Sequence, residues 1–413
     1  MPIVKQGTPM PKTPDTATQR EKTSSEKLVS AVFSGLEHEG GAAISARSLS
    51  AAAGLPVSSI YYHFGSVEQL LETSQREAHT AAERWCDAQL DAIGAGAPAL
   101  GPVLAGLIDD WCETQRALAF VRREAELAAL RDPVQTSISA AWEALWGRFW
   151  EALCGRLGIG DMAQSTAWFF DGASALHLLR WRRPVDRAAL SELCDHWAGW
   201  FEGRVGGAAP WFERARADAA ALLPPPPPGD AVADAIADAA ADTISQRGVA
   251  GLTHRAVAAA AGVTLGVVSY KFRTSADLLQ GAFEAIYRRM APEVGETRPL
   301  PPLTRAEARA KLEGLGPERA HQLAAEELFM AAARTPALQP LAARLRYLRG
   351  RSSGRFLQGL VGPERTIAPI DAAIISALAS GRSRAQICSG RTTRTPGADY
   401  AALLARLDRA SAK

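Results

Sequence analysis

The feature that most constrains the fold is an internal repeat, in which residues 44–64 recur 208 positions later as residues 252–272. The two stretches read ISARSLSAAAGLPVSSIYYHF and LTHRAVAAAAGVTLGVVSYKF and align without a gap. The register also holds outside them, at Leu28 with Ile236, Gly40 with Gly248 and Leu70 with Leu278. A repeat sets the architecture before any single element is assigned. The chain is therefore expected to contain two related units.

Each copy has the pattern of two short helices around a tight turn. In the first copy Ser45 can cap a helix that buries Leu49, Gly54 lets that helix end, and Pro56 starts a second helix over 57–64. Helix, short Gly-containing turn, helix is the geometry that places a second helix in the major groove of DNA. A single copy is equally compatible with an ordinary corner between helices, but a chance corner would not recur in this register.

Composition narrows the class of protein. The 413 residues are 47% hydrophobic and 22% charged, as in ordinary globular proteins. Without an 18-residue apolar run or an apolar leader, we expect no membrane span and a cytoplasmic location. Five scattered cysteines lack zinc-ligand spacing, and no nucleotide-binding loop or hydrolase motif is present. We therefore expect no enzyme, no metal site and no cofactor.

The net charge of +2 hides an asymmetry between the halves. Residues 1–223 contain 21 Lys and Arg against 27 Asp and Glu, whereas residues 224–413 contain 25 against 17. Phosphate affinity depends on local basic groups, so the acidic first half is not excluded from DNA binding.

Helical periodicity with breaks at Gly and Pro, and no alternating strand pattern, predicts an all-α chain. We divide it into an arm (1–22), a first helix-turn-helix domain (23–71), a first helical regulatory domain (72–209), a helix plus polyproline linker (210–229), a second helix-turn-helix domain (230–279) and a second helical regulatory domain (280–413). A long helix over 67–93 should join the first two domains. In the second half, helices are expected after 277 and near 304–314, 317–334, 337–361, 366–388 and 398–411.

All ten tryptophans lie in the first half, and three of them follow helical spacing at 142, 146 and 150. Such a stripe is typical of a core or a helix interface, and a pocket for an apolar or aromatic ligand is the alternative. The candidate pocket residues are Trp111, Trp142, Trp146, Trp168 and Phe169.

Two patterns in the second half also have structural consequences. The predicted 337–361 helix carries five arginines, which favours a solvated basic face over an anion-binding one. Small residues at 376–381 permit the 366–388 helix to pack closely on another helix, and the 161–180 helix of the first unit is the candidate partner.

Both copies resemble the N-terminal DNA-binding domain of the tetracycline-repressor (TetR) family of bacterial transcriptional regulators. The first copy matches the family pattern at Ser45, Gly54, Ile60, Tyr61, His63, Phe64, Ser66, Glu68, Leu70 and Leu71, and the second at Thr253, Gly262, Val263, Thr264, Gly266, Val268, Phe272, Leu278 and Leu279. The resemblance implies two TetR-like units, each a three-helix domain followed by a helical ligand-binding and dimerisation domain, packed as a pseudo-dimer within one chain.

The resemblance also implies DNA-binding residues, carried over position by position. Phosphates would be held by Ser45, Arg47, Tyr61 and His63 in the first copy and by Thr253, Arg255, Ser269 and Lys271 in the second. Base edges would face Val57, Ser59 and Tyr62, and Leu265, Val267 and Tyr270. The unlike sets predict two unlike half-sites. The chain departs from the family at Val67 and Ser275, where a lysine is usual, and at Ser269, where a tyrosine is usual.

The function implied is a ligand-responsive repressor that binds a bipartite double-stranded DNA operator with two non-identical recognition helices. Its effector would be an unknown small molecule, for which an apolar or aromatic character is the candidate, and further dimerisation of the fused chain stays open. The alternative is an interaction protein, a co-regulator or sequestering partner, whose helix-turn-helix units no longer bind DNA.

Overall fold

The computed structural model describes residues 22–95, 99–132, 137–222, 229–290, 303–314 and 319–388, together with Leu403 and Ala405. Over these residues every regular element is a helix and no strand occurs, as the periodicity predicts. None of the described helices is long and apolar enough to cross a membrane. The predicted arm, the proline run at 224–228 and the helix near 398–411 lie outside the described residues, apart from single positions.

The first helix-turn-helix domain follows directly from local signals in the sequence. Thr23 and Glu26 form a capping box at the start of α1. The Ser45 hydroxyl caps α2, and Gly54 ends it in the left-handed region at φ 65°. The helices are α1 (Ser24–His38), α2 (Ala46–Ala53), α3 (Ser58–Phe64) and the long α4 (Val67–Ile93), the last with the predicted bounds.

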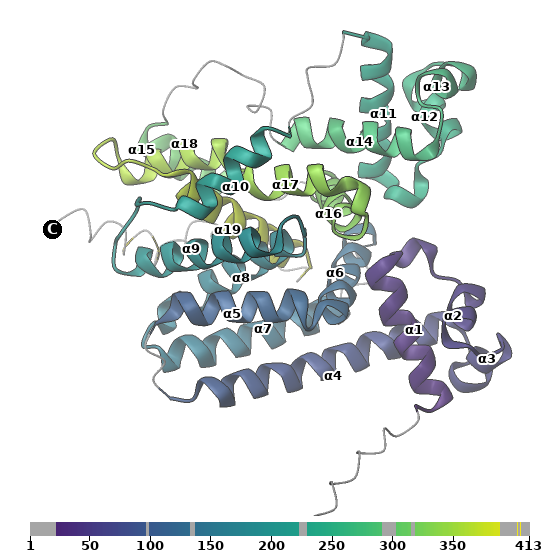
Figure 1. Cartoon of the computed structure of the whole chain (residues 1–413), viewed down its shortest axis with the longest axis horizontal. Helices are drawn as coiled ribbons and strands as arrows, with labels where there is room; N and C mark the ends of the chain where they lie inside the picture. The colour runs from purple at the N-terminus through teal and green to yellow at the C-terminus, as the bar shows by residue number, and fades with distance from the viewer. Residues whose placement is uncertain are drawn as a thin grey trace, which may run out of the picture.

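The second copy repeats this order of elements. Thr253 caps the second helix, and Gly262 ends it at φ 66°. Asp230 caps the first helix of the copy, also as expected. The helices are α11 (Ala231–Arg247), α12 (His254–Ala261), α13 (Leu265–Lys271) and α14 (Ser275–Met290). In Figure 1 the two helix-turn-helix pairs, α2 with α3 and α12 with α13, lie on the same side of the molecule.

The remaining helices form a bundle around an aromatic core. In the first half they are α5 (Leu100–Glu113), α6 (Arg116–Arg131), α7 (Ser137–Arg156), α8 (Ala163–His177), α9 (Arg183–Phe201) and α10 (Pro210–Ala220). In the second half they are α15 (Arg305–Gly314), α16 (Arg319–Arg334), α17 (Gln339–Tyr347), α18 (Arg351–Val361) and α19 (Pro369–Cys388). The largest fully buried side chains are Trp111, Trp142, Trp150, Trp197 and Trp200.

The single helix predicted over 337–361 is wrong, because α17 and α18 are separate. Gly350 stands between them with φ 111°, a conformation that side-chain-bearing residues rarely adopt. The solvated basic face is also wrong for two of its arginines. Arg344 is buried and pairs with Glu284 of α14, and Arg346 is buried beside Asp186 at 3.8 Å.

The close packing predicted for 366–388 is confirmed, because α19 lies along α8 (Figure 1). Two glycines make the approach possible. A Cβ at Gly172 of α8 would overlap the backbone carbonyl of Ala377, and a Cβ at Gly381 of α19 would overlap that of Trp168. Adding 209 to the numbers of Gly172 and Trp168 gives Gly381 and Ala377, so each contact is the counterpart of the other.

A second exchanged pair joins α6 to α16. Glu124 accepts from Arg334 at 2.6 Å, and Glu327 accepts from Arg131 at 2.5 Å. A shift of 203 residues relates these pairs. Each lies against the glycine that follows the first helix of a helix-turn-helix domain, Gly40 or Gly248. Arg334 also donates to the carbonyl of Leu36 near the end of α1 at 2.7 Å. The glycine that follows the first helix of each helix-turn-helix domain is therefore contacted by residues of both halves.

Candidate nucleic-acid interface

The recognition helices α3 and α13 are held by one buried side chain each. Ile60 is the buried residue of α3 and Val268 that of α13, and the two are 208 positions apart. The preceding helices are anchored in the same way by Leu49 and Val257. With so little of each recognition helix buried, its other faces are available to a partner.

Large side chains stand in solvent at the positions predicted to face bases. Tyr62 is 84% exposed and Tyr270 is 76% exposed, and Val57 and Leu265 are exposed as well. Exposed large apolar groups at equivalent positions of two helices indicate a binding surface, and apolar groups can contact thymine methyls in the major groove. Two predicted base-facing residues fit less well: Ser59 is half-buried, and half-buried Val267 packs against the core of its own domain.

The predicted phosphate contacts divide into occupied and available groups. Ser45 and Thr253 accept from backbone N–H groups at 3.1 Å as helix caps. The side chains of Arg47 and Arg255 are exposed, and neither side chain makes a hydrogen bond or ion pair with another residue that the structure describes. The remaining predicted residues, Tyr61, His63 and Ser269, are exposed.

Lys271 is the predicted phosphate contact that already has a partner. Its ammonium lies 2.5 Å from the carboxylate of Asp230, the cap of α11. This hydrogen bond raises the pKa of Lys271 and lowers that of Asp230. A phosphate would have to compete with a carboxylate for Lys271, and the first copy shows no equivalent pair among its described residues.

The five predicted pocket residues do not form one site. Trp111, Trp142 and Phe169 are buried in the aromatic core, where Trp111 and Trp146 meet edge to face with ring centroids 5.0 Å apart. Trp146 and Trp168 line a cavity that has a volume of about 430 Å³ and extends to α19. The core interpretation therefore holds for most of the tryptophans.

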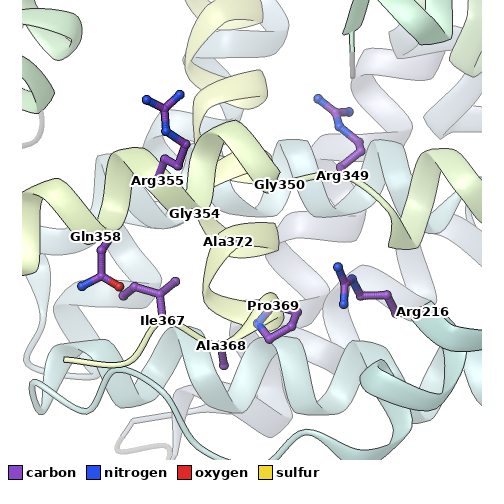
Figure 2. A pocket seen from close by; sticks show the side chains of 10 residues that line it. All are labelled: Arg216, Arg349, Gly350, Gly354, Arg355, Gln358, Ile367, Ala368, Pro369 and Ala372. Carbon is purple, nitrogen blue, oxygen red and sulfur yellow. The ribbon is translucent and has the colours of Figure 1, made fainter. Parts of the chain in front are cut away.

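A second cavity, of about 360 Å³, lies among α10, α18 and α19 (Figure 2). Figure 2 shows Arg216 reaching in from α10, while Arg349 and Arg355 rise beside Gly350 and Gly354. The guanidinium of Arg349 is already engaged, because it donates to Ser380 at 3.0 Å and lies over the ring of Phe329. Sequence reasoning missed this cavity, since its walls come from distant segments.

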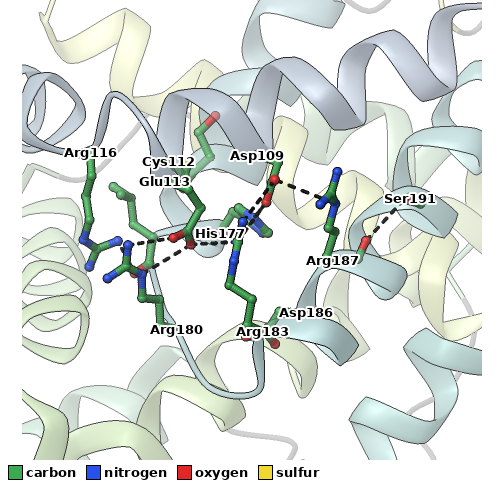
Figure 3. Close-up of polar contacts among 12 residues, drawn as sticks. Asp109, Cys112, Glu113, Arg116, His177, Arg180, Arg183, Asp186, Arg187 and Ser191 are labelled. Atoms are coloured by element: carbon green, nitrogen blue, oxygen red, sulfur yellow. Dashed lines mark hydrogen bonds and ion pairs between the residues drawn. The ribbon is translucent and has the colours of Figure 1, made fainter. Parts of the chain in front are cut away.

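Sequence reasoning also missed a buried histidine network, in which His177 of α8 contacts Asp109 of α5 (Figure 3) and Arg346 of α17. Nε2 of His177 lies 3.0 Å from the carboxylate of Asp109, which also accepts a hydrogen bond from Arg183. Nδ1 of His177 lies 2.6 Å from the guanidinium of Arg346. Burial and the positive charge of Arg346 lower the pKa of His177 to about 4. The hydrogen bond from His177 helps to lower the pKa of Asp109. Among the described residues, no group of His, Cys, Asp and Glu is placed to hold a metal ion.

Comparison with known proteins identifies the second copy. Residues 236–282, from within α11 to within α14, match the family model described as "Bacterial regulatory proteins, tetR family". This segment is therefore similar to the DNA-binding domain of that family. The TetR match agrees with the geometry of α12 and α13 and supports a transcriptional regulator of that family. It covers the second copy, so the function of the first copy rests on the repeat.

A solved structure gives a weaker likeness. SCO7518 from Streptomyces coelicolor A3(2), named as a transcriptional regulator, aligns over 42% of this chain and 98% of its own at 24% identity. The TM-score of 0.34 is too low to support any argument about arrangement. A search of curated proteins found no match.

Proposed function

We propose that this protein is a TetR-type transcriptional repressor whose two helix-turn-helix domains bind one bipartite operator with unlike half-sites. The observation that carries the proposal is the equivalence of α3 and α13. Each buries a single residue, Ile60 or Val268, and each presents a highly exposed tyrosine at the same position of the repeat. Because their other exposed side chains differ, the two helices would read different base sequences.

The exchanged contacts support a pseudo-dimer within one chain. A two-fold interface brings residue i onto j and j onto i, and two such pairs are present. One joins Glu124 with Arg334 and Arg131 with Glu327, and the other involves Gly172 and Gly381. With this arrangement one chain would supply the two recognition helices that family members obtain by dimerising, and would act in the cytoplasm on double-stranded DNA.

We further propose that an effector shifts the spacing of the recognition helices. The cavity at Trp146 and Trp168 is lined by residues of α7, α8 and α19, so a ligand there would contact both halves. A ligand can shift an equilibrium only through its different affinities for the two states. Repression would be relieved if the effector-bound spacing fits the operator less well.

The first test is selection of random double-stranded DNA by the full-length protein at moderate salt. Enrichment of a site with two unlike halves about one helical turn apart is expected. Arg47→Ala and Arg255→Ala should each weaken binding to the selected site and reduce its salt slope by about one. The matched control is Arg214→Ala, which removes an exposed arginine of α10 outside both helix-turn-helix domains.

A second candidate function is an interaction protein that does not bind DNA. The pair of Lys271 with Asp230 favours it, as does the absence of lysine at Val67 and Ser275. A well-folded protein that enriches no sequence, with both arginine variants behaving like wild type, would establish this alternative and overturn the repressor.

A further inference from the structure

The cavity between the two halves carries an unusual set of charges. It is bounded by α7 and α8 on one side and α19 on the other, with Trp146, Trp168 and Phe170 among its walls. Glu143 and Asp171 also line it, together with Arg122. Its volume of about 430 Å³ is within the usual range of small-molecule sites, about 300–1,000 Å³.

The ion pairs behind the cavity form one connected cluster from α6, α7, α8, α16 and α19. Its members are the cations Arg122, Arg123 and Arg384 and the carboxylates Glu126, Glu143, Asp171 and Glu326. Beyond these side chains, Arg349 interacts with Glu326 and Arg384, and buried Arg382 lies over the ring of Trp168. The cluster is therefore not short of positive charge as a whole, but one of its carboxylates has no close cation.

That carboxylate belongs to Glu143. Every other carboxylate of the cluster has an arginine nitrogen within 3.0 Å, whereas the nearest one to Glu143 is Arg122 Nη2 at 3.6 Å. Arg122 Nη2 is already bonded to Asp171 at 2.7 Å. Burial, together with the charges of Asp171 and Glu126, raises the pKa of Glu143 to about 7, although Arg122 and Arg123 oppose this.

We propose that the cavity binds an organic cation with a flat apolar body, whose charged nitrogen pairs with Glu143 against the Trp146 and Trp168 wall. Such a ligand would supply a close cation to Glu143. An anion would be repelled by the Glu143 carboxylate, and a neutral ligand would leave that carboxylate without a close cation. Flat apolar ligands also suit indole walls, and since Arg122 already lies over Trp146 and Arg382 over Trp168, the ligand would offer the indoles its apolar body and not its charge. The inference gives a chemical class to the effector and in that respect rests on the proposed function.

The probes for the test are three ligands with one ring system: 1-naphthylmethylamine, 1-naphthalenemethanol and 1-naphthoate. Binding to the full-length protein is measured by equilibrium dialysis at about pH 8, where the Glu143 carboxyl is ionised. The amine is expected to bind at least about tenfold more tightly than the alcohol, and the carboxylate least. Equal binding of the three, or preference for the carboxylate, would overturn the proposal.

Two substitutions locate the site. Glu143→Gln keeps the shape of the side chain and should weaken amine binding at least about tenfold, while leaving binding of the alcohol nearly unchanged. The matched control is Glu72→Gln, which removes an exposed carboxylate of α4 that is not part of the cavity lining and should leave the amine affinity within about twofold. Since Glu143→Gln removes a carboxylate that has no close cation, its melting temperature at pH 8 should not fall below that of wild type. Amine binding that survives Glu143→Gln would contradict the assignment.

A pH series gives an independent readout. The amine stays protonated, so its affinity should rise about tenfold from pH 6 to pH 8 as Glu143 ionises, and this rise should vanish in Glu143→Gln. Failure of the inference and failure of the proposed function are distinguishable. A protein that selects DNA but ignores the amine rejects only the cation site, and a protein that binds the amine without selecting DNA rejects only the regulator.

Discussion

The protonation state of His177 can be read from its neighbours. The guanidinium of Arg346 contains no acceptor atom, so it must donate to Nδ1 of His177. The ring proton of neutral His177 therefore lies on Nε2 and is donated to Asp109. A second ring proton would face the guanidinium of Arg346. This contact, with burial, explains why the pKa of His177 falls to about 4. The histidine is therefore a neutral link between α5, α8 and α17 at neutral pH.

This link predicts a loss of stability on mild acidification. His177 remains neutral in the folded state while it is protonated below about pH 6.5 in the unfolded chain, so stability is lost as the pH falls from about 6.5 towards 4. At pH 4.5 the loss from this group should be about 2.5 kcal/mol relative to pH 7, as measured by urea unfolding.

The matched variant for that measurement is His177→Gln, whose amide can accept from Arg346 and donate to Asp109 without titrating. Between pH 7 and pH 4.5, this variant should lose about 2.5 kcal/mol less stability than wild type. Parallel pH profiles for the two proteins would show that His177 is protonated in the folded state.

At the scale of elements, the crossing of α8 and α19 depends on Gly172 and Gly381. A methyl group at either position would overlap a backbone carbonyl, which cannot move like the end of a flexible side chain. Gly172→Ala should therefore destabilise the protein by about 1–3 kcal/mol in thermal or urea unfolding. The control is Gly106→Ala on exposed α5 surface, where the added Cβ meets nothing within 4 Å. It should stabilise the helix by about 0.5–1 kcal/mol. Equal effects of the two substitutions would contradict the close crossing.

The elements that could be predicted from sequence are those fixed by local signals. Capping by Ser45 and the left-handed Gly54 define α2, and α4 has its predicted bounds. The second half of the chain was predicted less well where distant residues decide the outcome. Arg344 and Arg346 read as a solvated face because their partners, Glu284 and Asp186, are 60 and 160 residues away.

The same limit applies to the candidate sites. Exposure of Tyr62 and Tyr270 could be predicted because the repeat places both on recognition helices. The pair of Lys271 with Asp230 could not, since the two are 41 residues apart and join different helices. The weak pairing of Glu143 was equally hidden, because it emerges only when α6, α7, α8, α16 and α19 assemble.

At the scale of the whole molecule, the two halves make equivalent ion pairs with each other but differ in their other charged and aromatic side chains. Glu124 and Arg131 are exchanged for Glu327 and Arg334, whereas Arg122 and Glu126 in the charge cluster correspond to Ala325 and Phe329. All ten tryptophans lie in the first half. In the proposed pseudo-dimer, unlike halves would hold two recognition helices in fixed relation while keeping one ligand site, which a dimer of identical subunits would duplicate.

This asymmetry predicts how the proposed operator should respond to symmetry. Once a bipartite site has been selected, replacing either half with an inverted copy of the other forces one recognition helix onto the wrong bases. Since each mismatched base pair costs about 1–3 kcal/mol, both symmetrised operators should bind at least about tenfold more weakly than the selected site, with one chain bound per operator. A homodimer with only one active recognition helix per chain would behave in the opposite way, because its best operator is palindromic. Band-shift titration of the three duplexes, with the mass of each complex measured, decides between them. Tighter binding of either palindrome by two chains would show that only one of α3 and α13 reads DNA.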